Sequence, residues 1–245
     1  VYYKQYNFEK ANETHQQAID LLKTSKCEQT AEYAKTLNSL GLDILFLNKY
    51  DESFKIINEA YEIRKKLFNS NDHQDLSDSL YSLGLNHYFK EDHKTSLEYD
   101  LKAFEMQKRL YKDSDHPDLA HSLNNIGDDY SNLNDYNTAL EYHLKAYAMR
   151  KRLYKDSDQH PDLAHSLYNI GVVYYNLNDY KTALEYDLKA YEMRKSIFKD
   201  PNHPDLVQSL NSISMTYNKL NDKTNSDKYS LLAKSMQERL DNKQN

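Results

Sequence analysis

Apolar residues recur along this chain at the spacing of an amphipathic α-helix, and the same spacing returns at a fixed period. Between residues 116 and 159, four of them follow one another at i, i+4, i+7 and i+11, namely Leu119, Leu123, Ile126 and Tyr130. This spacing predicts one face of a helix. Pro117 suits the first turn of that helix, where the missing N–H of proline would have no partner in any case.

A turn and a second helical pattern follow in the same unit. Asn134 and Asp135 favour a turn. Apolar or small residues then recur at Tyr136, Ala139, Leu140, Leu144, Ala146 and Tyr147. Each unit therefore predicts a pair of antiparallel helices. We expect these pairs to begin near Ala31, Gln74, Pro117, Pro161 and Pro204.

Every glycine of the chain falls at one phase of this repeat. The positions are Gly41, Gly84, Gly127 and Gly171, at steps of 43, 43 and 44 residues, with Ser214 at the next step. Glycine destabilises a helix interior by about 1 kcal/mol relative to alanine, so the two helices of a unit must approach closely there. We expect Gly127 and Gly171 to lie against the second helix of their own unit, near Ala139 and Ala183.

A fixed period of roughly 20–50 residues is typical of proteins built from stacked repeats. The predicted segments are a partial repeat at 1–28 (mainly a second helix), repeats at 29–72, 73–115, 116–159 and 160–202, and a fifth repeat with the C-terminal cap at 203–245. Half a unit would leave its buried face bare. We therefore expect further repeats or another domain upstream.

Composition excludes several function classes. The net charge of −6 argues against nucleic acid as a partner, because nucleic-acid-binding surfaces are normally basic. Cys27 is the single cysteine, which excludes an internal disulfide framework. The longest apolar stretch, Leu40–Leu47, is short and contains Asp43, so no membrane insertion is expected. We expect a cytoplasmic location.

The repeated small and large residues resemble the tetratricopeptide repeat. In the third full unit the matching residues are Leu123, Ile126, Gly127, Tyr130, Tyr136, Ala139 and Ala146. The period exceeds the family's usual ~34 residues. This long form, with the connection Leu-Tyr-Lys-Asp-Ser-Asp-His-Pro-Asp-Leu-Ala, is similar to the repeats of kinesin light chains. The resemblance implies an all-α fold, a right-handed α-solenoid of tandem antiparallel helix pairs.

One column departs from the family pattern. Asp100, His143 and Asp187 stand in mid second helix, where the family often has an apolar residue. We place Asp187, together with Glu192, on the outer face of that helix.

The third and fourth repeats permit an internal comparison. Residues 116–158 and 160–202 differ at 12 of 43 positions. Four of the differences lie in the first helix, namely Asn124/Tyr168, Asp128/Val172, Asp129/Val173 and Ser131/Tyr175. In the tetratricopeptide fold the first, second and fourth of these offsets point into the concave groove. The two copies therefore diverge where a ligand would lie, although ordinary drift at exposed positions explains the same pattern.

Carried through all repeats, these offsets define a predicted peptide-binding groove. Its first row is Asn38, Tyr81, Asn124, Tyr168 and Asn211, and its second is Leu42, Leu85, Asp128, Val172 and Met215. Its third row is Leu45, Phe89, Ser131, Tyr175 and Asn218, with His121 and His165 near the helix starts. Asparagine can donate to and accept from a peptide backbone at once. The mixture of amide, aromatic and aliphatic side chains suits an extended peptide.

The sequence gives less support to a metal site, a catalytic site or a basic binding surface. The repeated His-Pro-Asp segment offers possible metal ligands, but its copies are a whole repeat apart, so we interpret it as helix capping. Cys27 and His15 lack a third group for nucleophilic catalysis. The basic runs 64–66 and 150–152 fit helix C-termini and a solvated ridge. We expect no catalytic residue, no metal and no cofactor.

Two function classes remain. The resemblance to kinesin light chains implies an adaptor that binds a protein or peptide ligand in its groove. The alternative is a sensor or scaffold segment of a larger protein whose catalytic domain lies outside this chain.

Overall fold

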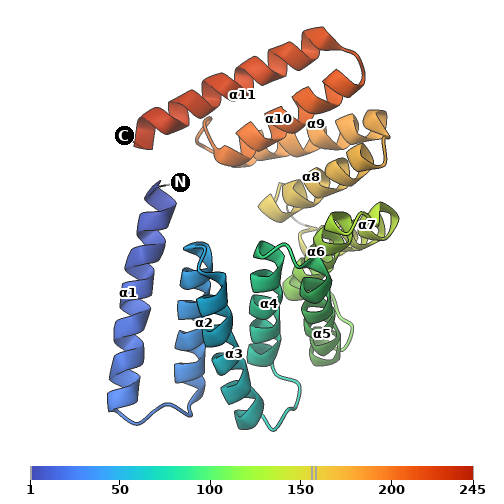
Figure 1. Cartoon of the computed structure of the whole chain (residues 1–245). Coiled ribbons are helices and arrows are strands. Elements are labelled where there is room, and N and C mark those ends of the chain that lie inside the picture. The colour runs from blue at the N-terminus through green and yellow to red at the C-terminus, as the bar shows by residue number, and fades with distance from the viewer. Residues whose placement is uncertain (1, 156, 158, 245) are drawn as a thin grey trace. The chain divides into compact units, whose positions relative to one another are not determined.

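The computed structural model describes residues 2–155, 157 and 159–244. Val1, Asp156, Asp158 and Asn245, which fall within the predicted repeats, lie outside the described residues. The described residues form α-helices and no strand (Figure 1). The helices are α1 Tyr2–Thr24, α2 Ala31–Phe46, α3 Tyr50–Leu67, α4 Gln74–Phe89, α5 His93–Tyr111, α6 Pro117–Asn132, α7 Tyr136–Leu153, α8 Pro161–Asn176, α9 Tyr180–Ile197, α10 Pro204–Lys219 and α11 Lys223–Gln244. The all-α prediction is confirmed.

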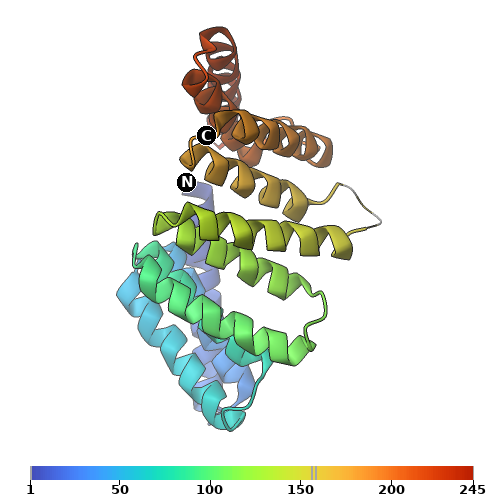
Figure 2. The same cartoon turned by 90° about the vertical axis from the view of Figure 1, so that its right-hand side faces the viewer.

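The helices belong to two compact units, residues 1–114 and 115–245. Within the first unit each helix from α1 to α5 packs against the next, and α2 also contacts α4. Within the second unit the same holds from α6 to α11, with further contacts of α8 to α6 and to α10 (Figure 2). The first helices of the pairs (α2, α4, α6, α8 and α10) begin at the five predicted residues.

A histidine caps four of these first helices. The Nδ1 atoms of His73, His116, His160 and His203 accept a hydrogen bond from the backbone N–H two residues on, at 3.1 to 3.2 Å. An aromatic ring from the preceding connection stacks on three of the imidazoles, with centroids 3.5 to 3.6 Å apart. The capping interpretation of the His-Pro-Asp segment is therefore confirmed. Within the part of the chain that the structure describes, no group of three potential ligands could hold a metal ion.

The turn between paired helices repeats as well. Asn48, Glu91, Asn134, Asn178 and Asn221 adopt left-handed backbone conformations, with φ between 61° and 64°. Asparagine tolerates this region because its short polar side chain bonds locally. At three of these turns the next residue, an aspartate, accepts a hydrogen bond from a threonine N–H and starts the second helix. The predicted turn at Asn134 and Asp135 is confirmed.

Buried arginines tie successive helix pairs together within each unit. Arg64, Arg150 and Arg194 lie in the last turn of α3, α7 and α9 and are only 3 to 4% exposed. Each donates from Nη1 to a backbone carbonyl in the first turn of the next helix and to a serine hydroxyl one turn further. The expectation of a solvated ridge is thus wrong for Arg64 and Arg150, because each is buried and donates to a backbone carbonyl and a serine hydroxyl of the following helix.

The glycines face the second helix of their own repeat, as predicted, but not mainly its alanines. A methyl group on Gly127 would lie 2.7 Å from the imidazole of His143. On Gly171 it would lie 2.7 Å from Oδ1 of Asp187 and 3.4 Å from the carbonyl oxygen of Ala183. The close approach therefore makes room for a side chain of the second helix.

The placement of Asp187 on the outer face is consequently wrong. His143 and Asp187 are each 1% exposed, and Ile57 at the same step is fully buried. The sequence pattern placed Asp187 on the surface because a polar residue in an amphipathic helix is normally exposed. The missing Cβ of the facing glycine supplies the space that the polar side chain occupies.

Candidate peptide-binding site

A pocket of about 310 Å³ lies between α8 and α10 in the second unit. Its lining residues are Tyr168, Val172, Tyr175, Asn176, Gln208, Asn211, Ser212 and Met215. Five of them belong to the predicted groove. The other three, Asn176, Gln208 and Ser212, were not predicted, although two of them lie within one helical turn of Asn211 on the same helix. The lining combines apolar surface with amides and hydroxyls and contains no carboxylate and no cationic side chain.

Tyr168 is held in place from behind by Arg194. The guanidinium carbon lies 4.7 Å from the centroid of the tyrosine ring. Arg194 is itself fixed, since its Nη1 donates to the carbonyl oxygen of Asp205 at 2.9 Å and to Oγ of Ser209 at 2.7 Å. Burial, followed by the nearby carboxylate of Asp187, raises the pKa of the Tyr168 hydroxyl. The ring is therefore a preorganised, neutral wall of the pocket.

Asp187 supports the opposite wall. Its Oδ2 atom accepts hydrogen bonds from Oγ of Ser212 at 2.9 Å and from Oγ1 of Thr216 at 3.1 Å. Burial raises the pKa of this carboxyl to about 6, against the lowering effect of the two hydroxyls and of Arg194. Ser212 thus faces the pocket and is at the same time bonded to a buried acid of α9.

The equivalent residues of the third repeat are engaged with one another. Asn124 is 2% exposed, donates to Oδ2 of Asp128 at 3.0 Å and accepts from Nδ2 of Asn169 at 3.1 Å. Asn169 also donates to Oδ1 of Asp128 at 3.1 Å. Burial and the neighbouring Asp129 raise the pKa of Asp128. Asn124 and Asp128 therefore link α6 to α8, and Asn169, which the sequence analysis missed, completes the network. Ser131 is half-buried.

In the first unit the predicted groove residues are mostly packed. Asn38 is 8% exposed and donates to Oγ of Ser82 at 3.0 Å. Tyr81, Leu42 and Leu85 are half-buried. Leu45 is 1% exposed, so its assignment to the groove is wrong, because its side chain belongs to the core of the unit.

Phe89 is 40% exposed, and its ring centroid lies 5.9 Å from that of Phe46. It stands one residue beyond the step of Ser131 and Tyr175, which falls on Tyr88. Asn218, His121 and His165 are exposed and none of them lines the pocket between α8 and α10. The pocket is therefore formed by only part of the predicted rows.

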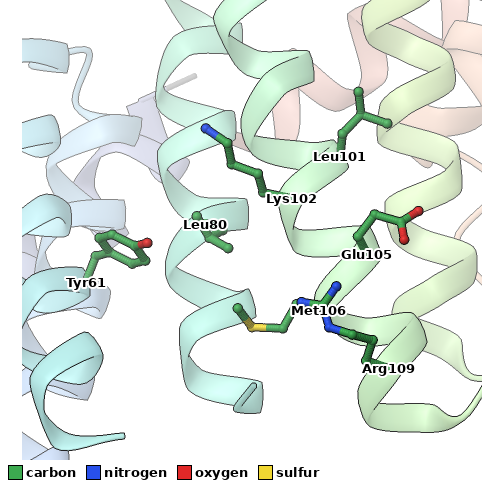
Figure 3. A pocket seen from close by; sticks show the side chains of 7 residues that line it. All are labelled: Tyr61, Leu80, Leu101, Lys102, Glu105, Met106 and Arg109. Carbon is green, nitrogen blue, oxygen red and sulfur yellow. The ribbon is translucent and has the colours of Figure 1, made fainter. Parts of the chain in front are cut away.

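A second cleft of about 430 Å³ lies in the first unit, between α3 and α5 and over α4 (Figure 3). Its lining residues are Tyr61, Leu80, Leu101, Lys102, Glu105, Met106 and Arg109. Arg109 is engaged in a two-point ion pair with Asp72, at 2.7 and 2.8 Å. The Lys102 ammonium lies 5.3 Å from the centroid of the Tyr99 ring. This cleft is larger, but its charged groups already have partners, and none of its residues follows from the repeat comparison.

The sequence matches the tetratricopeptide repeat family at residues 32–109, 75–152 and 163–205. The chain belongs to this family, whose members are generally protein–protein interaction modules and typically have no catalytic role. No catalytic family matches it. No curated protein matches the chain. Among the described residues, no helix has the length and apolar character needed to cross a membrane.

Several solved structures share the fold. BtubC (BKLC) from P. vanneervenii has 17% sequence identity and a TM-score of 0.74, with 97% of this chain and 91% of that chain covered. A putative kinesin light chain from Podosopora anserina with nearly identical TPR-like repeats has 14% identity and a TM-score of 0.69, with 86% and 98% covered. These two structural neighbours are kinesin-light-chain-like repeat proteins, as the resemblance implied.

Another neighbour is much longer than this chain. It is a Signal Transduction ATPase with Numerous Domains protein with a tetratricopeptide repeat sensor, from Pyrococcus horikoshii. Its identity is 20% and its TM-score 0.69, and the match covers 88% of this chain but 32% of that one.

Proposed function

We propose that this chain binds an extended peptide segment of a partner protein along the first helices of its second unit, with the pocket between α8 and α10 as the anchoring site. The observation that carries the proposal is that Tyr168, Val172, Tyr175, Asn211 and Met215, chosen from the repeat offsets and the resemblance to the tetratricopeptide fold, line one pocket of about 310 Å³. Pockets that bind small ligands or anchor side chains start at about 300 Å³ and combine apolar walls with a few polar groups.

The chemistry of the lining favours an uncharged anchor residue. The aromatic and aliphatic side chains offer apolar contact area, and Met215 is 56% exposed, so that area is still available to a ligand. The amides of Asn176, Gln208 and Asn211 can each donate and accept, as the backbone of an extended peptide requires. The absence of cationic side chains from this lining, together with the net charge of −6, does not favour nucleic acid.

The test exchanges the pocket for the residues of the third repeat. A peptide is first selected on the wild-type protein from a random displayed library, and its affinity is measured by fluorescence anisotropy. The triple variant Tyr168→Asn, Val172→Asp and Tyr175→Ser should lose at least about tenfold in affinity, since three apolar contacts disappear. Circular dichroism should show an unchanged helix content.

A matched control changes the same number of residues to their third-repeat counterparts on the exposed side of α9, as Lys181→Asn, Glu192→Ala and Ser196→Arg. These three side chains are exposed, so the affinity should stay within about twofold. Asp187 is unsuitable for this control because it is buried. Full binding by the triple variant and loss by the control would move the site to the second helices and refute the groove.

A second function is favoured by one comparison. The neighbour with a tetratricopeptide repeat sensor is about three times as long as the region it shares with this chain, because the match covers 32% of it. We infer as the alternative that this chain serves as the sensor or scaffold segment of a larger, cytoplasmic protein. The full-length coding sequence, and a fluorescent fusion of its product, would decide between the two.

A further inference from the structure

The carboxyl group of Asp187 lies behind the pocket and is almost completely buried, with 1% of the residue exposed. Its two oxygens differ in their surroundings. Oδ2 accepts from the hydroxyls of Ser212 and Thr216, at 2.9 and 3.1 Å. Oδ1 has no hydrogen-bond partner among the described residues and points to the place where Gly171 lacks a side chain.

A buried ionisable group of this kind is costly unless it is well bonded. Neither of its two partners is on its own helix, so the hydrogen bonds run from α9 to α10. Arg194, one helical turn from the carboxyl end of α9, makes a second link from α9 to the first turns of α10 through Asp205 and Ser209. Arg194 and Asp187 therefore bind α10 at different points along its length.

The third repeat carries no such link at this column. There the residue is His143, which is also 1% exposed. The residues of α8 at the steps of Ser212 and Thr216 are Asn169 and Val173. Asn169 bonds to Asn124 and Asp128 of α6 instead, and a valine side chain has no hydrogen-bonding group. The acid and the two hydroxyls therefore occur together where the pocket is.

We propose that Asp187 is a positioning residue for the peptide-binding pocket, holding Ser212 and Thr216 so that α10 presents its wall at the correct distance from α8. Ser212 belongs both to this hydrogen-bond network and to the pocket lining, so the carboxylate acts on the site through one intervening side chain. The inference rests on the proposed function of the pocket.

Among the described residues, no other group of α9 accepts hydrogen bonds from Ser212 and Thr216, so the carboxylate alone can position these two hydroxyls from that helix. On α9 the guanidinium of Arg194 attracts it, and on α8 the hydroxyl of Tyr168 interacts with it electrostatically. From α10 only the two hydroxyls reach it. No other acceptor on α9 is bonded to these hydroxyls, so removing the carboxyl leaves only the link that Arg194 makes to α10.

The experiment compares Asp187→Ala, Asp187→Asn and His143→Ala in the whole chain. The probe is the peptide selected on the wild-type protein. Asp187→Ala should weaken binding about tenfold, the effect expected from losing two hydrogen bonds that position a wall. Asp187→Asn keeps one acceptor oxygen and should restore affinity to within about threefold. His143→Ala removes an equally buried side chain at the same column and should leave the affinity unchanged.

Hydrogen exchange gives a reading that does not depend on the peptide. Asp187→Ala should accelerate exchange of the α10 amides selectively, Asp187→Asn should restore protection, and His143→Ala should leave α10 as in the wild type. If Asp187→Ala does not fold, Thr216→Val removes one partner from the α10 side and should weaken binding severalfold.

The outcomes separate the two proposals. If the wild-type protein selects no peptide, the proposed function is wrong, and the exchange of α10 alone decides whether Asp187 holds that helix. If a peptide binds and needs Tyr168, Val172 and Tyr175, but Asp187→Ala or Thr216→Val binds it as well as the wild type, the positioning role is wrong. Equal losses in Asp187→Ala and His143→Ala would also overturn it, because they would reflect general loosening.

Discussion

The third and fourth repeats share a framework and differ in what they do with it. Both begin with a histidine cap and both end with a buried arginine bonded to a serine of the next helix. Yet Asn124 and Asp128 of the third repeat are bonded to Asn169, whereas Tyr168 and Val172 of the fourth line a pocket. The histidine cap and the buried arginine are the same in both repeats, whereas the positions of Asn124 and Asp128 carry an internal hydrogen-bond network in the third repeat and line a pocket in the fourth.

The third and fourth repeats also differ at a buried position. The column opposite the glycine holds His143 in one and Asp187 in the other, each 1% exposed. A base and an acid thus occupy the same kind of buried place. Burial disfavours the protonated form of His143 and the ionised form of Asp187, so these two residues should contribute to the pH dependence of stability in opposite directions.

The largest effect that we predict is this opposite pH dependence. Burial lowers the pKa of His143 from 6.5 to about 4, so this residue costs stability as pH falls from about 6.5 to about 4. Burial raises the pKa of Asp187 from 3.8 to about 6, so this residue costs stability as pH rises from about 4 to about 6. Each contribution is on the order of 3 kcal/mol, and in the wild type they largely cancel.

Urea unfolding at a series of pH values checks this. Asp187→Asn removes the acid, so the unfolding free energy should rise more steeply with pH between about 4 and 6 than in the wild type. His143→Gln removes the base, so the unfolding free energy should rise less steeply with pH, or fall more steeply, across the same interval than in the wild type. The comparison fails if both variants follow the wild-type pH profile, since neither side chain would then change its proton affinity on folding.

The next effect concerns the glycines that make room for these side chains. Gly127→Leu and Gly171→Leu should each destabilise by about 1–3 kcal/mol through overpacking. Alanine should cost less than about 1 kcal/mol, because its methyl group comes too close only to the side-chain ends of His143 and Asp187 and makes an ordinary contact with the carbonyl oxygen of Ala183, while it gains about as much in helix propensity. Thermal unfolding measures both, and equal shifts from leucine and alanine would mean that the glycines are not closely packed.

The smallest effect is on the surface. Arg152 of the third repeat makes a two-point ion pair with Asp115, at 2.6 and 2.7 Å, whereas the fourth repeat has Ser196 at that step. Both partners are largely exposed, so Arg152→Ser should cost at most about 1 kcal/mol. The difference should shrink in high salt. A loss that is larger than this and insensitive to salt would show that the pair acts as a structural link.

The repeat period and the helix boundaries follow from the sequence because they depend on local properties. Pro161 and Pro204 begin helices wherever they stand in such a pattern, and Asn178 provides its turn without help from distant residues. The apolar stripe of each helix also reveals which face packs inward. The repeat offsets, together with the resemblance to the tetratricopeptide repeat, likewise picked out Tyr168 and Met215, which lie in one pocket, but most residues of the same rows lie outside it.

Only the tertiary structure decides which polar side chains meet. Asn124 fits a groove by its offset but is bonded to residues of α6 and α8, and Asp187 fits a surface by its polarity but is buried against α10. Sequence periodicity predicts which face of its own helix a residue occupies, but it does not predict how far that face lies from the neighbouring helix. That distance depends on how closely two helices pack, and here the missing side chain of Gly171 decides it.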